Sequence, residues 1–441
     1  MWSGSLSDPK VMRLRGCDGR AAKPPTARLS SHPPGPLSHR LQRCGIGSDS
    51  VASDRHPLAL SALRMPLVTP PTDAQVLTVQ PLCLQTVHVE ATMAPNDNLR
   101  ILGFGNPLLD ISATVDQKEM DKWGVKPGDI ILADEGGKHK PMYGELTKTH
   151  KVEYIAGGAT QNSIRVAQWM NGTPGTTAFI GCIGKDAFGE QLESAAKADG
   201  VDVHYYKQDK VETGTCAVLV PAGGDRALIA NLAAANCYDK AHFDSAPVQA
   251  LLKSTKIVYC AGFPLTTPAG PPTIMAMGKE LNESGKTFCM NLSAPFIIQV
   301  PPFKAALDAA LAHVDFLFGN ETEAATYGEV SGWGKDVATV ALKLAAMPKA
   351  CGSRPRVVVF TQGCDPTIVA CGGTVSQFPV PKLDKKDLVD TNGAGDAFVG
   401  GFLSRLSMGA DLATCVAAGN YAARQIIQVS GCKIPSTPAA F

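Results

Sequence analysis

Residues 390–401, with the sequence Asp-Thr-Asn-Gly-Ala-Gly-Asp-Ala-Phe-Val-Gly-Gly, combine a glycine turn, a helix start and a carboxylate. Gly393 and Gly395 can adopt backbone angles that expose consecutive N–H groups. Small and apolar residues from 394 to 406 predict a helix after the turn, and a helix N-terminus attracts anions. Asp396 falls in the first helical turn, where its carboxylate could accept a proton from a hydroxyl group that attacks a phosphate. The segment therefore predicts a phosphoryl-transfer site.

Each part of that reaction has a candidate group in the same segment. Gly393, Ala394 and Gly395 would supply backbone N–H donors to the transferred phosphoryl group. Asp396 would be the general base for a primary hydroxyl group. An isolated aspartate in a first helical turn is more often only a favourable charge for the helix dipole. The glycines on both sides of Asp396 favour the catalytic interpretation.

The segment 390–401 resembles the C-terminal signature of the PfkB, or ribokinase-like, carbohydrate kinases. A second segment, Gly157-Gly158-Ala159-Thr160-Gln161-Asn162-Ser163, is similar to the N-terminal glycine signature of that family. Four further segments resemble the family members that phosphorylate adenosine: 105–110, 231–236, 291–296 and 320–323. The resemblance runs from about Leu99 to the C-terminus. It implies magnesium-requiring, ATP-dependent phosphorylation of the adenosine 5′-hydroxyl group to AMP, a step of purine salvage.

The pattern along the chain predicts an α/β fold. The 441 residues are 44% apolar, which is enough for a large core, and a net charge of +1 gives no basic face for nucleic acid. From Leu99 onward, apolar runs that favour strands alternate with stretches of helical spacing. Strands are expected at 99–105, 152–155, 176–183, 256–261, 287–291, 314–318 and 356–361, and helices at 160–170 and 187–198. This alternation predicts a mostly parallel sheet with helices on both faces.

Two regions, 110–134 and 203–236, interrupt the alternation. In the second region, residues that favour strands flank Gly223-Gly224-Asp225 and predict antiparallel strands joined by a turn. We interpret both regions as a small β-sheet lid over the edge of the main sheet. In ribokinase-like kinases such a lid closes over the sugar, and the resemblance implies the same here.

Residues 1–95 differ from the expected kinase domain at 96–441. They are rich in Pro, Ser and Arg, show no sustained periodicity and are expected to be disordered. Basic residues outnumber acidic ones up to Arg43, which permits a transit peptide for a plastid or a mitochondrion. An equally supported alternative is an upstream translation of no structural consequence, because Met93 stands just before the first expected strand.

The cysteines indicate a reducing compartment. The chain has 13 of them without a C-x-x-C pair, and several, such as Cys260 and Cys289, lie within apolar runs. No apolar run approaches the about 20 residues of a membrane-spanning helix. We therefore expect a cytoplasmic monomer without membrane or nucleic-acid partners, or a plastid or mitochondrial protein if residues 1–92 are a transit peptide.

Asp110 is the clearest candidate for binding the acceptor. It ends an expected buried strand beside Asn106, where a carboxylate suits two ribose hydroxyl groups. The resemblance implies the same role and places four further residues with the substrate: Gly158, Ala159, Asn162 and Asn392. It also implies that the adenine base contacts apolar residues of the lid and the sheet, namely Leu132, Cys216, Leu228, Ala230, Leu232, Phe263 and Phe296. Without the family, these would be interpreted as core residues.

Asn320 and Glu323 stand between an expected strand and a helix, where a carboxylate can hold Mg²⁺ through its water shell. Their spacing is also typical of a helix-capping box, and the two roles are compatible. The resemblance implies that this pair influences magnesium and phosphate binding. It implies contacts with ATP for four further residues, Asn291, Thr361, Gly363 and Asn420.

Arg226 follows the turn of the proposed lid, so that lid closure would bring its guanidinium group toward the phosphates. An arginine beside a turn is more often only solvated, and the resemblance is the main support for the functional role. The sequence departs from the animal adenosine-phosphorylating members at three positions: Ile130 replaces a glutamine, Ala159 a serine and Pro264 a phenylalanine. These changes concern base recognition and leave the phosphoryl-transfer groups intact.

Two alternatives remain open. A PfkB-family kinase for a free sugar would need polar partners where the chain has Leu228, Leu232 and Phe263; a kinase for another nucleoside is the closer variant of this alternative. A catalytically silent, plastid-targeted relative could act as a binding subunit. Such a relative would have no physical need for the glycine turn and Asp396 together.

Overall fold

The computed structural model describes residues 101–133, 137–221, 226–352 and 354–441. The expected N-terminal extension and the turn at 223–225 lie outside the described residues. Within the described ranges, no helix combines the length and the apolar character that crossing a membrane requires.

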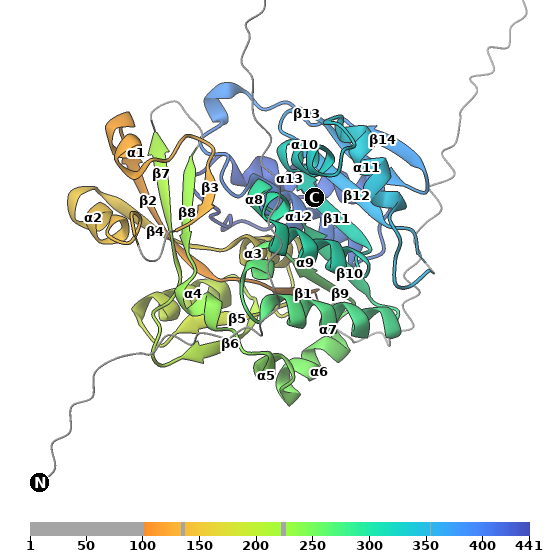
Figure 1. Ribbon diagram of the computed structural model, residues 1–441, viewed down its shortest axis with the longest axis horizontal. Coiled ribbons are helices and arrows are strands. Elements are labelled where there is room, and N and C mark those ends of the chain that lie inside the picture. Colours follow the sequence, from red (N-terminus) through yellow and green to blue (C-terminus); the bar gives the residue numbers. More distant parts are fainter. Residues whose placement is uncertain (1–100, 134–136, 222–225, 353) are drawn as a thin grey trace, which may run out of the picture. The chain divides into compact units, whose positions relative to one another are not determined.

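A nine-stranded sheet forms the main layer, in the order β14-β13-β12-β11-β10-β9-β1-β5-β6 (Figure 1). The strands from β12 to β6 are parallel, whereas β13 and β14 are antiparallel to their neighbours. Their bounds are β1 (Ile101–Phe104), β5 (Thr177–Gly184), β6 (Asp202–Gln208), β9 (Ile257–Cys260), β10 (Thr287–Asn291), β11 (Phe316–Asn320), β12 (Val357–Gln362), β13 (Asp365–Cys371) and β14 (Thr374–Phe378). The predicted α/β class with a mostly parallel sheet is confirmed.

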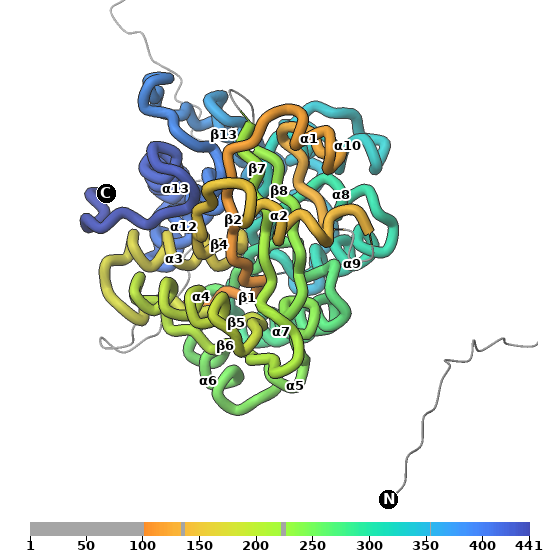
Figure 2. The backbone as a smooth tube through the Cα atoms, turned by 90° about the vertical axis from the view of Figure 1, so that its left-hand side faces the viewer, coloured from red at the N-terminus to blue at the C-terminus, as the bar shows by residue number. Residues whose placement is uncertain are grey.

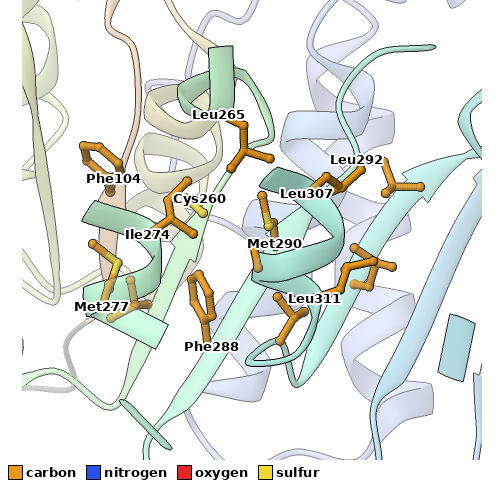
Figure 3. Packing of buried hydrophobic residues seen from close by; sticks show 14 of the residues in the cluster. Phe104, Cys260, Leu265, Ile274, Met277, Phe288, Met290, Leu292, Leu307 and Leu311 are labelled. Atoms are coloured by element: carbon orange, nitrogen blue, oxygen red, sulfur yellow. The ribbon is translucent and has the colours of Figure 1, made fainter. Parts of the chain in front are cut away.

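Helices cover both faces of this sheet because its central strands alternate between two apolar clusters. Leu102 and Phe104 of β1 belong to one cluster and Ile101 to the other. The first cluster, part of which Figure 3 shows, includes residues of α5 (Lys240–Phe243), α6 (Ala246–Ser254), α7 (Gly270–Glu283), α8 (Pro295–Gln299), α9 (Pro301–Leu311), α10 (Glu321–Val330) and α11 (Val337–Ala346). The second includes residues of α3 (Ala159–Asn171), α4 (Ala187–Ala198), α12 (Ala394–Leu406) and α13 (Leu412–Ile426).

A second, five-stranded sheet has the order β3-β8-β7-β2-β4. Its strands are β2 (Leu108–Val115), β3 (Ile130–Leu132), β4 (Val152–Gly157), β7 (Thr215–Pro221) and β8 (Ala227–Asn231). The expected antiparallel pairing on either side of residues 223–225 is present between β7 and β8. The predicted lid boundaries were wrong in two places, because β6 pairs with β5 in the main sheet and β4 pairs with β2 in the small one.

The two faces of the small sheet have different surroundings. Ala217, Leu219 and Ile229 point to one face and pack with apolar residues of α1 (Gln117–Trp123) and α2 (Met142–Thr149). Both views place α1 and α2 on the side of the small sheet away from the nine-stranded sheet (Figures 1 and 2). The opposite face carries a second set of apolar side chains, which is described below as the ligand face.

Candidate active site

The glycine turn and the helix after it lie where the sequence predicts them. Helix α12 begins at Ala394, and its N-cap residue Gly393 has a φ of 78°, in the left-handed region that glycine tolerates. A Cβ atom at Gly393 would also lie 3.0 Å from the Cβ of Cys432. Both the positive φ and this close contact therefore disfavour a larger residue at position 393. Asp396 occupies the first turn of α12. The N–H group of Ala394 donates to the carbonyl oxygen of Thr391 at 3.1 Å, so one of the three predicted donors is engaged within the turn. The N–H group of Gly395 and the Asp396 carboxylate lie next to each other in the first turn of the helix.

Close packing of α12 on α3 brings a second polar residue to Asp396. The Asn162 Nδ2 group on α3 donates a hydrogen bond to Asp396 Oδ2 at 3.0 Å. A Cβ atom at Gly400 would lie 2.5 Å from the carbonyl oxygen of Ser163, so only glycine permits this approach of the two helices. Gly401 makes a similar approach to Ala418 of α13. The two glycines after Asp396 thus act through helix packing.

Asp110 lies on β2, with its side chain toward the ligand face. It stands beside Cys216 in the parallel register of β2 and β7, and it is 8% exposed. A Cβ atom at Gly157 would lie 2.4 Å from Asp110 Oδ1, so glycine at that position leaves room for the carboxylate. Gly158, with a φ of 93°, passes equally close to the carbonyl oxygen of Asn106. The N-terminal glycine pair therefore shapes the surroundings of Asp110.

Three acidic groups at the site have raised pKa values. Burial raises the pKa of Asp110 to about 7, and the charge of Asp396 adds to this effect. Burial raises the pKa of Asp396 to about 6, partly offset by the hydrogen bond from Asn162. Burial also raises the pKa of Glu323 to about 7, although the backbone N–H group of Asn320 opposes the shift. The charge of Asp396 raises the pKa of both other groups, so Asp396 lies within electrostatic reach of each of them.

Two amide atoms at the site have unused hydrogen-bonding capacity. Asn106 Nδ2 and Asn162 Oδ1 are buried, and within the described part of the chain neither atom has a hydrogen-bond partner. A buried polar atom without a partner is costly unless a ligand or water supplies one. Asn162 already binds Asp396 through Nδ2, so its free oxygen is available to a hydroxyl donor. Both asparagines are predicted substrate contacts.

The structure gathers most of the predicted base contacts on the ligand face of the small sheet. Cys216 and Leu232 are buried there, and Leu132, Leu228 and Ala230 pack against them while partly exposed. The remaining two, Phe263 and Phe296, lie 6.1 Å apart between ring centroids and pack against the main core. Phe263 belongs to the 3₁₀ turn Phe263–Thr266 after β9, and Phe296 belongs to α8. The predicted set thus forms two apolar groups on different elements.

Asn320 and Glu323 form a complete capping box at the start of α10. Glu323 N–H donates to Asn320 Oδ1 at 2.8 Å, and Asn320 N–H donates to Glu323 Oε2 at 3.0 Å. The capping interpretation is therefore confirmed. No group of three His, Cys, Asp or Glu side chains within the described ranges could hold a metal ion. A single buried carboxylate beside an anion site fits Mg²⁺ that keeps most of its water ligands, which is how proteins commonly bind it with phosphates.

Most residues predicted to contact ATP lie near the carboxyl ends of adjacent strands, where ligands bind open α/β sheets, and Asn420 is the exception. Asn291 ends β10, Asn320 ends β11, and Thr361 pairs with Asn320 in the β11–β12 register. Gly363 follows β12 with a φ of 57°. Asn420 lies on α13 and is 8% exposed.

Arg226 does not project freely from the described part of the small sheet. Its Nε atom forms an ion pair with Asp390 Oδ1 at 2.5 Å, and its side chain is 10% exposed. Asp390 is also bound by the N–H group of Asn392, a predicted substrate contact, at 2.9 Å. Arg226 is therefore not the solvated arginine that its position beside a turn suggests. It is held beside the glycine turn, and its role toward the phosphates stays a prediction.

Sequence reasoning missed Asp390 and Ser293. Ser293 has a φ of 71°, a strained value for a residue with a Cβ atom. Its N–H group donates to Asn291 Oδ1 at 2.8 Å, and its Oγ accepts from Gly262 N–H at 2.7 Å. Ser293 therefore joins the ends of β9 and β10. The Asn291-Leu-Ser-Ala-Pro run contains no glycine that signals such a turn, whereas Asp390 was visible within the segment 390–401.

Comparisons with known proteins identify the family of the chain. The family model for pfkB family carbohydrate kinases matches residues 117–440. Adenosine kinase 1 of Arabidopsis thaliana is 51% identical over 339 residues, which are 77% of this chain and 96% of that protein. Adenosine kinase of Dictyostelium discoideum is 41% identical over 340 residues, covering 77% of this chain and 98% of its own length.

Among solved structures, Anopheles gambiae adenosine kinase in complex with P1,P4-di(adenosine-5) tetraphosphate is similar, with a TM-score of 0.71 and 44% identity. The match covers 75% of this chain and 96% of that one. Schistosoma mansoni adenosine kinase in complex with 2-fluoroadenosine has a TM-score of 0.73 and 35% identity, covering 76% and 97% of the two chains.

Substitution of Gly157 by alanine tests the space reserved for Asp110. The added Cβ atom would displace the Asp110 carboxylate, and we expect the KM of the acceptor nucleoside to rise roughly tenfold or more with a smaller effect on kcat. Gly144→Ala is the control, because no atom lies within 4 Å of its added Cβ. Steady-state kinetics of both variants provide the measurement. An unchanged KM in Gly157→Ala would contradict the role of Asp110.

The raised pKa of Asp396, about 6, predicts an acid limb in the pH profile of kcat/KM, which reports the free enzyme. A base must be deprotonated, so kcat/KM should fall as the pH drops through that pKa. The Asn162 hydrogen bond favours the charged form, and Asn162→Ala should therefore move the limb to higher pH. Asn171→Ala, at the other end of α3, serves as the control. A limb that stays in place or moves to lower pH would refute this coupling.

Proposed function

The chain belongs to the pfkB family of carbohydrate kinases, and on that premise we propose that it is an adenosine kinase. It transfers the terminal phosphoryl group of ATP to the 5′-hydroxyl group of adenosine and releases AMP and ADP. The observation that carries this proposal is the position of Asp396, which lies beside the amide turn of residues 393–395 and within electrostatic reach of Asp110 on the ligand face.

The proposed roles follow from the chemistry of an in-line transfer. Asp110 accepts hydrogen bonds from the ribose hydroxyl groups and thereby fixes the nucleoside. Asp396 accepts the proton of the 5′-hydroxyl group as its oxygen attacks phosphorus. The N–H groups of Gly393 and Gly395 stabilise the negative charge on the transferred group, while the Ala394 N–H group holds the turn through its hydrogen bond to the Thr391 carbonyl oxygen. These groups are preorganised by the helix start, so little reorganisation accompanies the reaction.

Glu323 is the residue that would hold magnesium, through water molecules of the ion. The ion would neutralise charge on the ATP phosphates. Support comes from the burial of this carboxylate at the ends of β10 and β11, beside Asn320. The capping box and the metal site are compatible, because hydrogen bonds from Asn320 leave lone pairs on both carboxylate oxygens.

The ligand face favours a nucleoside over a free sugar. A sugar without a base would leave Leu132, Leu228 and Ala230 facing water or a polar ligand. A silent relative would have no use for three carboxylates held at raised pKa values by burial. Closure of the small sheet as a lid, a monomeric state and a cytoplasmic location remain our proposals, the last from the cysteine pattern.

An assay of the full chain against adenosine, inosine, ribose and fructose with Mg-ATP tests the proposed function. Formation of ADP should have the highest kcat/KM with adenosine. A higher kcat/KM with a free sugar would establish the first alternative. Calorimetric binding of adenosine without turnover of any acceptor would establish the silent relative.

Asp396→Asn separates chemistry from binding. Asparagine keeps an oxygen for the Asn162 donor but cannot take up the proton, so kcat should fall about 10²- to 10⁴-fold. The dissociation constant of adenosine should change less than threefold, measured by calorimetry. A variant with near-normal turnover would reject Asp396 as the base.

Glu323→Gln separates metal binding from helix capping. Glutamine also completes a capping box through its oxygen, but its NH2 group would face one of the two Asn320 donors, so the melting temperature should fall modestly while the protein stays folded. The Mg²⁺ concentration for half-maximal rate should increase several-fold. Glu321→Gln, an exposed glutamate in the same helical turn, is the control. Equal magnesium dependence in both variants would remove Glu323 from the metal site.

A further inference from the structure

Asp390 is a buried carboxylate that joins three segments far apart in the chain. The residue is 4% exposed, and its carboxylate accepts from Arg226 Nε at 2.5 Å, from Asn392 N–H at 2.9 Å and from Gly431 N–H. The described contacts of Asp390 thus bind both carboxylate oxygens to donors. A buried carboxylate with such partners is held in one position.

The three donors belong to different parts of the proposed site. Arg226 immediately precedes β8 of the small sheet, and Asn392 immediately precedes Gly393 of the amide turn. Gly431 lies in the segment after α13 with a φ of 70°, and a Cβ atom there would lie 2.5 Å from Ile155 of β4. Asp390 therefore ties the small sheet to the turn that would receive the phosphoryl group.

Among the described residues, the other contacts of Arg226 are too weak to position it alone. Its Nη1 atom donates to Ser112 Oγ at 3.3 Å and its Nη2 atom to Ser430 Oγ at 3.5 Å. Both distances exceed those of strong hydrogen bonds, whereas the Asp390 ion pair is short. Ser112 lies two residues after Asp110 on β2 and therefore points to the same face of the sheet. The ion pair at Nε therefore leaves the Nη groups with only these two long hydrogen bonds, one of them to Ser112 on the ligand face.

The charge of Arg226 is useful at this position. Asp110 and Asp396 are both acidic, and ATP adds further negative charge. Arg226 counteracts the raised pKa of Asp110, so its guanidinium acts on the site electrostatically. A cation that must approach phosphates needs an anchor to hold it there, and a planar guanidinium can pair with one anion while offering donors to another.

We propose that Asp390 is a positioning residue for phosphoryl transfer. It fixes the amide turn through Asn392 and holds Arg226 beside that turn, where the weakly bonded Nη groups can exchange their serine partners for a phosphate. This inference rests on the proposed kinase function. Asp390 touches no reacting atom in this arrangement and acts through the turn and through Arg226.

The test is a double-mutant cycle on the full chain with Asp390→Asn and Arg226→Gln. Asparagine keeps the shape of Asp390, but its amide group would face a donor. We expect each single variant to lower kcat roughly 10- to 100-fold, while the dissociation constant of adenosine stays within about threefold. The double variant should be no slower than the slower single variant, because both changes disrupt one unit. Asp384→Asn, an exposed aspartate six residues earlier, should leave kcat unchanged.

Three results would overturn the inference. They are a wild-type kcat in Asp390→Asn, multiplicative losses of kcat in the double variant, and a dissociation constant of adenosine that rises by as much as kcat/KM falls. Arg226→Lys gives an independent measurement if Asp390→Asn does not fold. Lysine keeps the charge but cannot pair with Asp390 and present further donors in one plane, so its kcat should fall as well, and a wild-type kcat would again refute the role. Failure of the proposed function is distinct, because wild-type protein would then phosphorylate no nucleoside.

Discussion

The close contact between α3 and α12 is the constraint on which the site depends. A side chain at Gly400 would collide with the backbone of Ser163, so glycine lets the first turns of both helices meet. The Asn162–Asp396 hydrogen bond joins those turns. Two helix N-termini, each with free N–H groups and a partial positive charge, therefore lie beside one another. Such a place suits the anionic group of a phosphate donor better than either helix alone.

This arrangement buries three acidic groups, and their burial affects the stability of the protein. Burial raises the pKa values of Asp110, Asp396 and Glu323, so the folded protein holds their protons more firmly than the unfolded chain does. These groups therefore contribute stability at low pH, and that contribution is lost as the pH rises through their folded pKa values. Catalysis by Asp396 needs the deprotonated form. The burial that gives Asp396 a pKa suitable for a base therefore also lowers the stability of the folded protein near neutral pH, as is common at functional sites.

The sequence predicted those helices, strands and caps that depend on residues close together in the chain. Strand 287–291 and the helices 187–198 and 394–406 have the predicted bounds, and Asn320 and Glu323 form the expected capping box. Pairing partners were less predictable: β6 contains polar residues because it is an edge strand of the main sheet, and it was therefore assigned to the lid. The Asp390–Arg226 ion pair links residues 164 positions apart, which no local pattern reveals. The assigned roles of the site residues remain predictions.

A crystal structure with adenosine and a non-hydrolysable ATP analogue tests the central claim most directly. The account predicts the 5′-oxygen within about 3 Å of an Asp396 oxygen, and the terminal phosphate on the N–H groups of Gly393 and Gly395. A 5′-oxygen bound away from Asp396, with the phosphate outside that turn, would contradict it.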